Sequence, residues 1–310
     1  MPPATPSSAV LVTGCSSGIG RAVAARLARS GRPVWATARQ PGTLAELASL
    51  GARTLALDVT DEDSMRAAVE QVEAEHGAVG ALVNNAGYGL HGPVETTPVA
   101  EVRRQLETNL IGPVRLIQLV LPGMRRRRAG RIVNLSSMGG RLTLPGGAFY
   151  HASKYALEAV SDALRFELRP FGIQVVLIEP GPVLSGFSDA ALATMPVAAG
   201  PGERAGAAPG GEAGVPGSAG EAARAYAAFT ASVTQAFGAA YTDSGPLARL
   251  SSRPGQVAAV VERALAARSP RPRYVVGPIG RTLVGLRRVL PDRAFDLLLR
   301  AQYRPAPERR

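Results

Sequence analysis

The chain has 310 residues, a net charge of +11 and one cysteine, Cys15. This length and the hydrophobic fraction of 46% suit one large α/β domain or two small ones. A lone cysteine excludes an internal disulfide and a cysteine-based zinc site, which fits a reducing, cytoplasmic location. Aromatic residues make up only 5%, which argues against nucleic-acid binding, and arginines interrupt the longest apolar runs, which argues against a membrane span.

The first predicted elements are a strand and a helix joined by a glycine-rich turn. Residues 9–12 form an apolar run, residues 13–20 read Thr-Gly-Cys-Ser-Ser-Gly-Ile-Gly, and residues 21–29 have helical periodicity. Glycine leaves room for phosphate oxygens to approach the N–H groups at a helix start, so the turn predicts a dinucleotide phosphate site. Its spacing differs from the Gly-x-Gly-x-x-Gly pattern, and a turn without a ligand is the alternative.

Further strands follow at a regular rhythm. Apolar runs at 33–39, 54–57 and 79–83 predict three more strands, and Asp61 is placed to cap the helix after the third strand. Strands that alternate with helices predict a parallel sheet. We therefore expect a three-layer Rossmann-type, doubly wound sheet of about seven strands, with helices on both faces and ligands at the carboxyl ends of the strands.

The end of the second strand indicates which dinucleotide binds. An acidic residue there would bind the ribose 2′-hydroxyl of NAD, but Ala38 and Arg39 occupy this position. An arginine suits a 2′-phosphate, so the sequence favours NADP(H) over NAD(H). The alternative is that Arg39 is a solvated loop residue.

Lys154 is the only lysine among 35 basic residues. Tyr150 precedes it by four residues in a segment, 149–168, with helical apolar spacing, so the phenol and the ammonium should share one helix face. A nearby positive charge favours the phenolate, and we expect Lys154 to lower the pKa of Tyr150 and make it a general acid/base. A chance pair of surface residues is the alternative.

Together these motifs resemble the short-chain dehydrogenase/reductase family, and within it the branch of the 17β-hydroxysteroid and retinol dehydrogenases. The resemblance covers most of residues 9–190 and a short segment near Arg273-Tyr274. It rests on residues 13–20, Asn84 to Gly87, Asn109, Ser137, Tyr150 with Lys154, and Pro180-Gly181.

The resemblance implies roles for four residues. Tyr150 would be the catalytic acid/base, and Lys154 would lower its pKa and hold the nicotinamide ribose. Ser137 would donate a hydrogen bond to the substrate oxygen, with Ser136 as the competing candidate. Asn109, in a predicted helix over about 98–124, would hold a water that links the lysine to solvent, and a buried structural amide is the alternative.

The same resemblance and the turn chemistry predict the residues that hold the cofactor. Ser185 stands where the family usually has a threonine. The predicted set is Gly14, Ser16, Ser17, Gly18, Ile19, Gly20, Arg39, Asp58, Val59, Asn85, Ala86, Gly87, Tyr150, Lys154, Pro180, Gly181, Val183 and Ser185. No metal site is expected, because the three histidines lack metal-ligand spacing; His91 and His151 flank motifs and are candidates to touch substrate, with simple exposure as the alternative.

The C-terminal part predicts a substrate lid. Residues 198–223 are dominated by Gly, Ala and Pro and are expected to be a flexible insertion, and residues 224–250 to be the lid. Phe229, Val233 and Phe237 should line a hydrophobic pocket or pack in the core. The tail over 281–303 has leucines and arginines at helical spacing; it is expected to pack on the core or another subunit, with contact to an anionic membrane as the alternative.

The sequence thus predicts a single catalytic domain over 9–303 between flexible tails at 1–8 and 304–310. It predicts an NADP(H)-dependent oxidoreductase that interconverts a secondary alcohol and a ketone on a small hydrophobic substrate. We expect a homo-oligomer, a dimer or tetramer, with no nucleic-acid partner. The alternatives are a non-catalytic NADP(H)-sensing protein and a membrane-associated binding protein.

Overall fold

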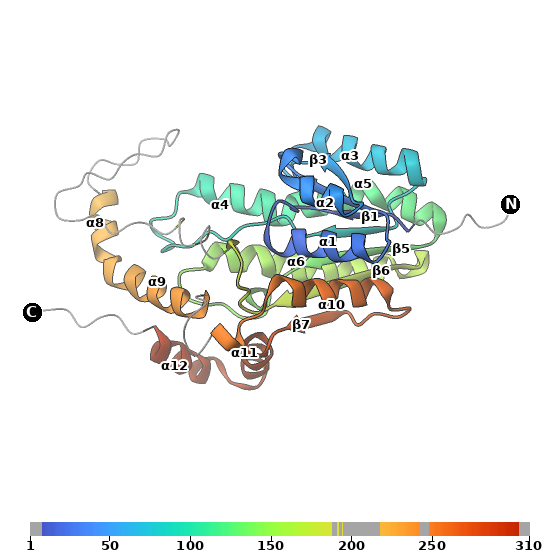
Figure 1. The fold of residues 1–310 in the computed structure, drawn as a ribbon. Coiled ribbons are helices and arrows are strands. Elements are labelled where there is room, and N and C mark those ends of the chain that lie inside the picture. The colour runs from blue at the N-terminus through green and yellow to red at the C-terminus, as the bar shows by residue number, and fades with distance from the viewer. Residues whose placement is uncertain (1–7, 188–190, 192–193, 195–217, 242–247, 304–310) are drawn as a thin grey trace, which may run out of the picture.

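The computed structural model describes residues 8–187, 191, 194, 218–241 and 248–303. The predicted tails over 1–7 and 304–310, and residues 198–217 of the predicted insertion, lie outside these residues. Among the described residues, the chain forms one parallel sheet covered by helices on both faces (Figure 1).

The sheet has seven strands in the order β3-β2-β1-β4-β5-β6-β7, and all neighbouring pairs are parallel. From β1 the chain adds β2 and β3 on one side of the sheet, and it then returns to add β4 on the other side of β1. In a doubly wound sheet, the crevice for a ligand lies at the carboxyl ends of the strands where this order reverses. The predicted fold class is confirmed. The strands are β1 (Val10–Val12), β2 (Val34–Ala38), β3 (Arg53–Ala56), β4 (Ala81–Asn84), β5 (Gly130–Leu135), β6 (Ile173–Pro180) and β7 (Arg273–Val276).

The sheet separates two hydrophobic cores, one on each face. In β1, Val10 and Val12 pack against α1, α2 and α10, whereas Leu11 faces α3 and α5. Strands buried on both faces explain why the sequence shows continuous apolar runs. The α-helices are α1 (Gly18–Arg29), α2 (Ala45–Ser49), α3 (Glu62–His76), α4 (Val99–Leu106), α5 (Gly112–Arg127), α6 (Ala148–Glu167), α8 (Ser218–Ala225), α9 (Ala227–Tyr241), α10 (Pro254–Ala266), α11 (Pro278–Val289) and α12 (Asp292–Gln302).

Short helical turns and caps complete the frame. The predicted cap is confirmed, because Asp61 Oδ1 accepts a hydrogen bond from the Ser64 N–H at 3.0 Å, and Gly77 ends α3 with φ of 71°. The 3-10 turns are η1 (Pro41–Leu44), η3 (Met138–Gly140), η4 (Arg169–Phe171) and η5 (Ala248–Leu250), and η2 (Glu107–Ile111) is a π-helical turn.

Arg273 at the start of β7 fastens the last strand to α6 and β6. Its guanidinium contacts Glu158 at 2.9 Å, Glu179 at 3.1 Å and Asp162 at 2.6 Å. Burial, with repulsion from Glu158, raises the pKa of Glu179 to about 7. Glu158 lies one helical turn after Lys154 on α6, and Glu179 directly precedes Pro180 at the end of β6. Through these two carboxylates, Arg273 holds α6 and the end of β6 together next to the site.

Three predictions about helices need correction. The helix expected over 98–124 is interrupted by η2, because Asn109 bonds sideways to a neighbouring loop and the Gly112 N–H bonds back to Glu107. Residues 218–223, expected in the flexible insertion, belong to α8, since alanine supplies four of its eight residues and favours a helix. The C-terminal tail forms two helices rather than one amphipathic segment, and α11 and α12 bury only Gly280 and Phe295 respectively.

Candidate functional site

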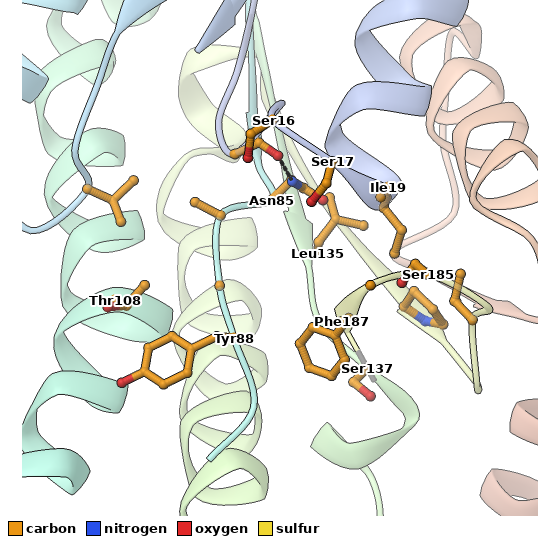
Figure 2. A pocket seen from close by; sticks show the side chains of 18 of the residues that line it. Ser16, Ser17, Ile19, Asn85, Tyr88, Thr108, Leu135, Ser137, Ser185 and Phe187 are labelled. Carbon is orange, nitrogen blue, oxygen red and sulfur yellow. Dashed lines mark hydrogen bonds between the residues drawn. The ribbon is translucent and has the colours of Figure 1, made fainter. Parts of the chain in front are cut away.

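A cavity of about 500 Å³ opens at the carboxyl ends of the strands. Every predicted cofactor residue lines it except Gly20, and both candidate serines, Ser136 and Ser137, line it as well. Figure 2 shows Ser16 and Ser17 of the glycine turn at one end and Ser137 with Phe187 at the other, while Tyr88 and Thr108 flank the opening on the α5 side. One cavity therefore extends from the glycine-rich turn to the Tyr150-Lys154 pair.

The glycine turn is shaped by close backbone approaches. Gly14 and Gly18 have φ of 70° and 56°, in the left-handed region that favours glycine. A Cβ on Gly20 would lie 2.2 Å from the Gly14 carbonyl oxygen, so a side chain there would collide with the turn. Asn85 locks it in place by donating from Nδ2 to the Thr13 and Gly14 carbonyls at 2.8 and 3.0 Å. The turn leaves the start of α1 open to the cavity, which fits a dinucleotide phosphate.

Cys15 lies beneath this turn and is fully buried. Its Sγ donates to the Val12 carbonyl at 3.3 Å. Burial raises the pKa of the Cys15 thiol to about 12, so the thiol stays protonated at neutral pH. This cysteine packs the turn and has no reactive character.

The outer end of the cavity carries Arg39 and Asp58. Arg39 is exposed at the end of β2, beside the buried Ala38, so its charge faces the cavity mouth. Asp58 is held by the Thr60 N–H and hydroxyl, at 2.9 and 2.8 Å. An exposed arginine on the β2 side and a fixed carboxylate on the β3 side offer different partners to the two ends of an adenosine group.

At the inner end, the structure brings Tyr150 and Lys154 together but corrects the expected direction of the tyrosine pKa. The Lys154 Nζ lies 5.9 Å from the centre of the Tyr150 ring and donates to the Leu135 carbonyl at 2.8 Å. Burial raises the pKa of Tyr150, and the hydrogen bond with Ser137 opposes this rise only in part. Burial also lowers the pKa of Lys154 to about 8. Desolvation is the largest influence on the phenol, so the pKa of Tyr150 lies above its usual value and the phenol holds its proton at neutral pH.

Of the two candidate serines, Ser137 is the one whose hydroxyl faces Tyr150. Ser137 Oγ accepts from the Gly139 N–H at 3.0 Å, which leaves its own proton for Tyr150 or a ligand. The Ser136 hydroxyl is buried beside Gly140, on the side of Glu158, and has no hydrogen-bond partner within the described part of the chain. This placement favours Ser137 as the expected donor.

The Asn109 amide, next to the Tyr150-Lys154 pair, forms hydrogen bonds with other groups of the protein. Its Oδ1 accepts from the Tyr88 N–H at 3.1 Å, and its Nδ2 donates to the Tyr88 carbonyl and the Ser153 hydroxyl at 2.9 and 3.2 Å. A Cβ on Gly87 would lie 3.0 Å from Asn109 Oδ1 and 3.8 Å from Lys154 Nζ. These contacts hold the loop after β4 against α6, as expected of a structural amide, and they leave the predicted water-holding role of Asn109 a prediction.

Aromatic rings gather at the Tyr150 end of the cavity: Phe187 and Tyr241 line it, whereas His91 and Phe237, both candidates from the sequence, pack against Tyr150 and Tyr241. Phe187 lies 5.7 Å from the Tyr150 ring, and His91 stacks on it at 6.0 Å. From α9, Phe237 contacts His91 at 4.8 Å and stacks on Tyr241 at 4.4 Å. His91 is buried rather than exposed, and burial lowers its pKa to about 4, so the ring is neutral. Phe187 ends the segment that follows the Pro180-Gly181 motif, whereas Tyr241 comes from a segment without a motif, and only its aromatic character could have marked it.

None of the three α9 residues expected to line a pocket or pack in the core is among the lining residues of the cavity: Phe237 contacts His91, and Phe229 packs on Tyr226 at 6.2 Å. Val233 is buried against Gly146, and a Cβ on Gly146 would lie 2.6 Å from Val233 Cγ1.

None of the helices in the described part of the chain has the length and apolar character that crossing a bilayer requires. The same residues contain no cluster of three metal-ligating side chains.

Comparison with known proteins adds to this geometry. The family model described as short chain dehydrogenase matches residues 8–195. A 3-ketodihydrosphingosine reductase of Bacteroides thetaiotaomicron is 43% identical over 181 residues, which cover 58% of this chain and 65% of that protein. Human 17-beta-hydroxysteroid dehydrogenase type 1 is 44% identical over 195 residues, which cover 59% of each chain. The matched segments thus span less than two thirds of these relatives. A solved short-chain dehydrogenase from Streptomyces avermitilis is 30% identical with a TM-score of 0.71, covering 96% of this chain and 95% of that one.

Proposed function

Because the chain belongs to the short-chain dehydrogenase family, we propose that it is an NADP(H)-dependent oxidoreductase that interconverts a secondary alcohol and a ketone on a hydrophobic substrate. The observation that carries the proposal is the single cavity that joins the glycine turn to Tyr150, Lys154 and Ser137. A binding protein that only senses the dinucleotide would not need a proton-holding phenol at the far end of its site.

The chain's own residues supply proton transfer and orientation. The bound nicotinamide cofactor would supply or accept the hydride. Tyr150 holds its proton and can give it to a carbonyl oxygen, or take one from an alcohol in the reverse direction. Ser137 donates a hydrogen bond to the same oxygen, where negative charge develops. The Lys154 ammonium, held at the Leu135 carbonyl, stabilises the phenolate that remains.

The preference for NADP(H) rests on Arg39. Its exposed guanidinium lies at the cavity mouth next to Ala38, at the strand end where an acid would bind a free ribose hydroxyl. A guanidinium binds a phosphate by charge-assisted, bidentate hydrogen bonds. The glycine turn then receives the diphosphate, and the segment from Pro180 to Ser185 covers the nicotinamide end.

The hydrophobic substrate is supported by the rings around Tyr150. Phe187 and Tyr241 present apolar surface to the cavity, Phe237 packs against Tyr241, and His91 is neutral. The names of two relatives point the same way, since a ketodihydrosphingosine and a hydroxysteroid are both large and mainly apolar.

The test has two stages. Fluorescence titration should give tighter binding of NADPH than of NADH, by about tenfold for one charge-assisted phosphate contact. A panel of sphingoid, steroid and shorter aliphatic ketones is then followed through the absorbance of NADPH. Turnover of a large apolar ketone supports the proposal. Tight NADPH binding without turnover of any ketone would favour the sensing protein, and failure to bind either dinucleotide would refute both.

A further inference from the structure

His151 follows Tyr150 on α6 and is 5% exposed. Its ring lies 5.6 Å from the Tyr150 ring, and both of its nitrogens bond to the backbone of the segment between Ser137 and α6. The Nδ1 lies 2.9 Å from the Gly139 carbonyl oxygen, and the Nε2 lies 3.2 Å from the Leu144 N–H. One imidazole thus holds this segment at two points.

The chemistry of the two partners fixes the state of the ring. A carbonyl can only accept, so Nδ1 must carry the proton, and a backbone N–H can only donate, so Nε2 must be bare. The arrangement requires the neutral Nδ1–H tautomer. Burial lowers the pKa of His151, which agrees with a ring that stays neutral, and the bond to Gly139 opposes this shift only in part.

The segment is also shaped around this ring. A Cβ on Gly139 would lie 2.5 Å from His151 Nδ1, and one on Gly147 would lie 2.8 Å from Nε2. The imidazole therefore occupies the space that side chains at positions 139 and 147 would need. The backbone of residues 139–147 packs around this ring.

The same contact reaches the predicted hydrogen-bond donor. Gly139, whose carbonyl accepts from His151, uses its N–H to hold Ser137 Oγ at 3.0 Å. Because Ser137 Oγ accepts this bond, its own proton is left for another acceptor, and Ser137 is the side chain that hydrogen-bonds Tyr150. We propose that His151 is a positioning residue, which in its neutral Nδ1–H form aligns the Ser137 hydroxyl with Tyr150 and thereby couples turnover to the protonation of one buried histidine. This proposal rests on the proposed function.

Protonation would break the alignment. An imidazolium would direct an N–H at the Leu144 N–H, so one of the two backbone contacts is lost and the segment must move. The titratable groups that face the ring are Tyr150 on α6 and His91 in the loop after β4, whose pKa the charge of His151 lowers; Lys154, the nearest ammonium on α6, lies against the Tyr150 ring. Each of these is neutral or positive, so none stabilises the imidazolium.

Kinetics on the full chain test the role. We expect kcat of the wild type to fall on an acid limb that lies below the usual histidine value of about 6.5, because burial lowers the pKa of His151. His151→Phe, which keeps a ring but has no nitrogen, should lower kcat by about tenfold or more, leave the Kd of NADPH unchanged and abolish this acid limb. His151→Asn keeps a donor for the Gly139 carbonyl and should recover part of kcat without the limb. The control His76→Gln changes a histidine at the end of α3 and should keep the wild-type kcat and the acid limb of its pH profile.

Wild-type kcat together with an unchanged acid limb in His151→Phe would overturn the proposal. A second measurement needs neither a variant nor turnover: ¹⁵N NMR of histidine-labelled wild-type protein should show one histidine as the Nδ1–H tautomer at pH 7. If all three histidines are Nε2–H or doubly protonated, His151 does not play this part. An Nδ1–H tautomer in a protein that turns over no ketone would leave the geometry intact and sink only the proposed function.

Discussion

The two ends of the cavity are built in different ways. The outer end is made of backbone: Gly14, Gly18 and Gly20 bring chain segments within van der Waals contact, and Asn85 ties them together. The inner end is made of side chains from distant parts of the chain, with Phe187 after β6 and Phe237 on α9. A backbone site tolerates few changes and suits a constant ligand, whereas a ring-lined site can change its shape one residue at a time. Substitutions at the cofactor end should therefore abolish or weaken cofactor binding, whereas substitutions at the substrate end should change which substrates are accepted.

The largest expected effect lies where the two ends meet. Tyr150→Phe removes the transferable proton and should lower kcat about 10³-fold, while the Kd of NADPH changes less than about twofold. Steady-state kinetics and fluorescence titration give the two numbers. Tyr155→Phe, at an exposed tyrosine on the same helix, is the matched control and should behave as wild type. Retention of most of the activity in Tyr150→Phe would show that another group transfers the proton.

The backbone end should fail completely on a minimal change. Gly20→Ala places a methyl group 2.2 Å from the Gly14 carbonyl and 2.4 Å from Asn85 Nδ2, so the turn must open. We expect the NADPH affinity to fall about 100-fold and the free energy of unfolding to drop by about 1–3 kcal/mol. Gly42→Ala, where no atom of the described residues lies within 4 Å of the new methyl group, should change neither. Equal behaviour of the two variants would remove the argument that the turn is a backbone site.

One side chain at the outer end should act on one cofactor only. Arg39→Gln is expected to weaken NADPH binding about tenfold and leave NADH binding unchanged, because only NADPH carries the 2′-phosphate. Titration with both dinucleotides measures the ratio, with the exposed Arg29→Gln on α1 as control. A parallel loss of NADH affinity would mean that Arg39 supports the loop rather than the phosphate.

The smallest effect is expected at the ring-lined end. Phe237→Ala removes the ring that supports His91 and the cavity-lining Tyr241, and the KM of a large ketone should rise about three- to fivefold while kcat and the Kd of NADPH stay near wild type. Smaller ketones should lose less. If Phe237→Ala instead lowers kcat about 100-fold for every ketone, the inner end is as constrained as the glycine turn and the contrast between the ends is lost.

The sequence predicts the outer end well because its information is local. Glycine spacing, the strand run before it and the acid-free end of β2 are all read within about thirty residues, and the structure brings these residues to one cavity. The inner end depends on burial, which spacing does not contain. The raised pKa of Tyr150 follows from desolvation by groups such as Phe187 that lie far away in the chain, and the π-turn at Asn109 follows from a contact with the loop at Tyr88. The bonds of His151 are equally invisible until Gly139 and Leu144 have folded around the ring.

Cys15 gives the protein an internal reporter. It is the only thiol in the chain, it is buried under the glycine turn, and burial raises its pKa to about 12, so a thiol reagent can reach it only when that turn opens. The rate at which an added disulfide reagent labels the native protein therefore records the opening of the dinucleotide site, without any engineered probe. A bound cofactor that closes the turn must slow this labelling. The motion of the site can thus be timed on the unmodified protein, independently of any substrate.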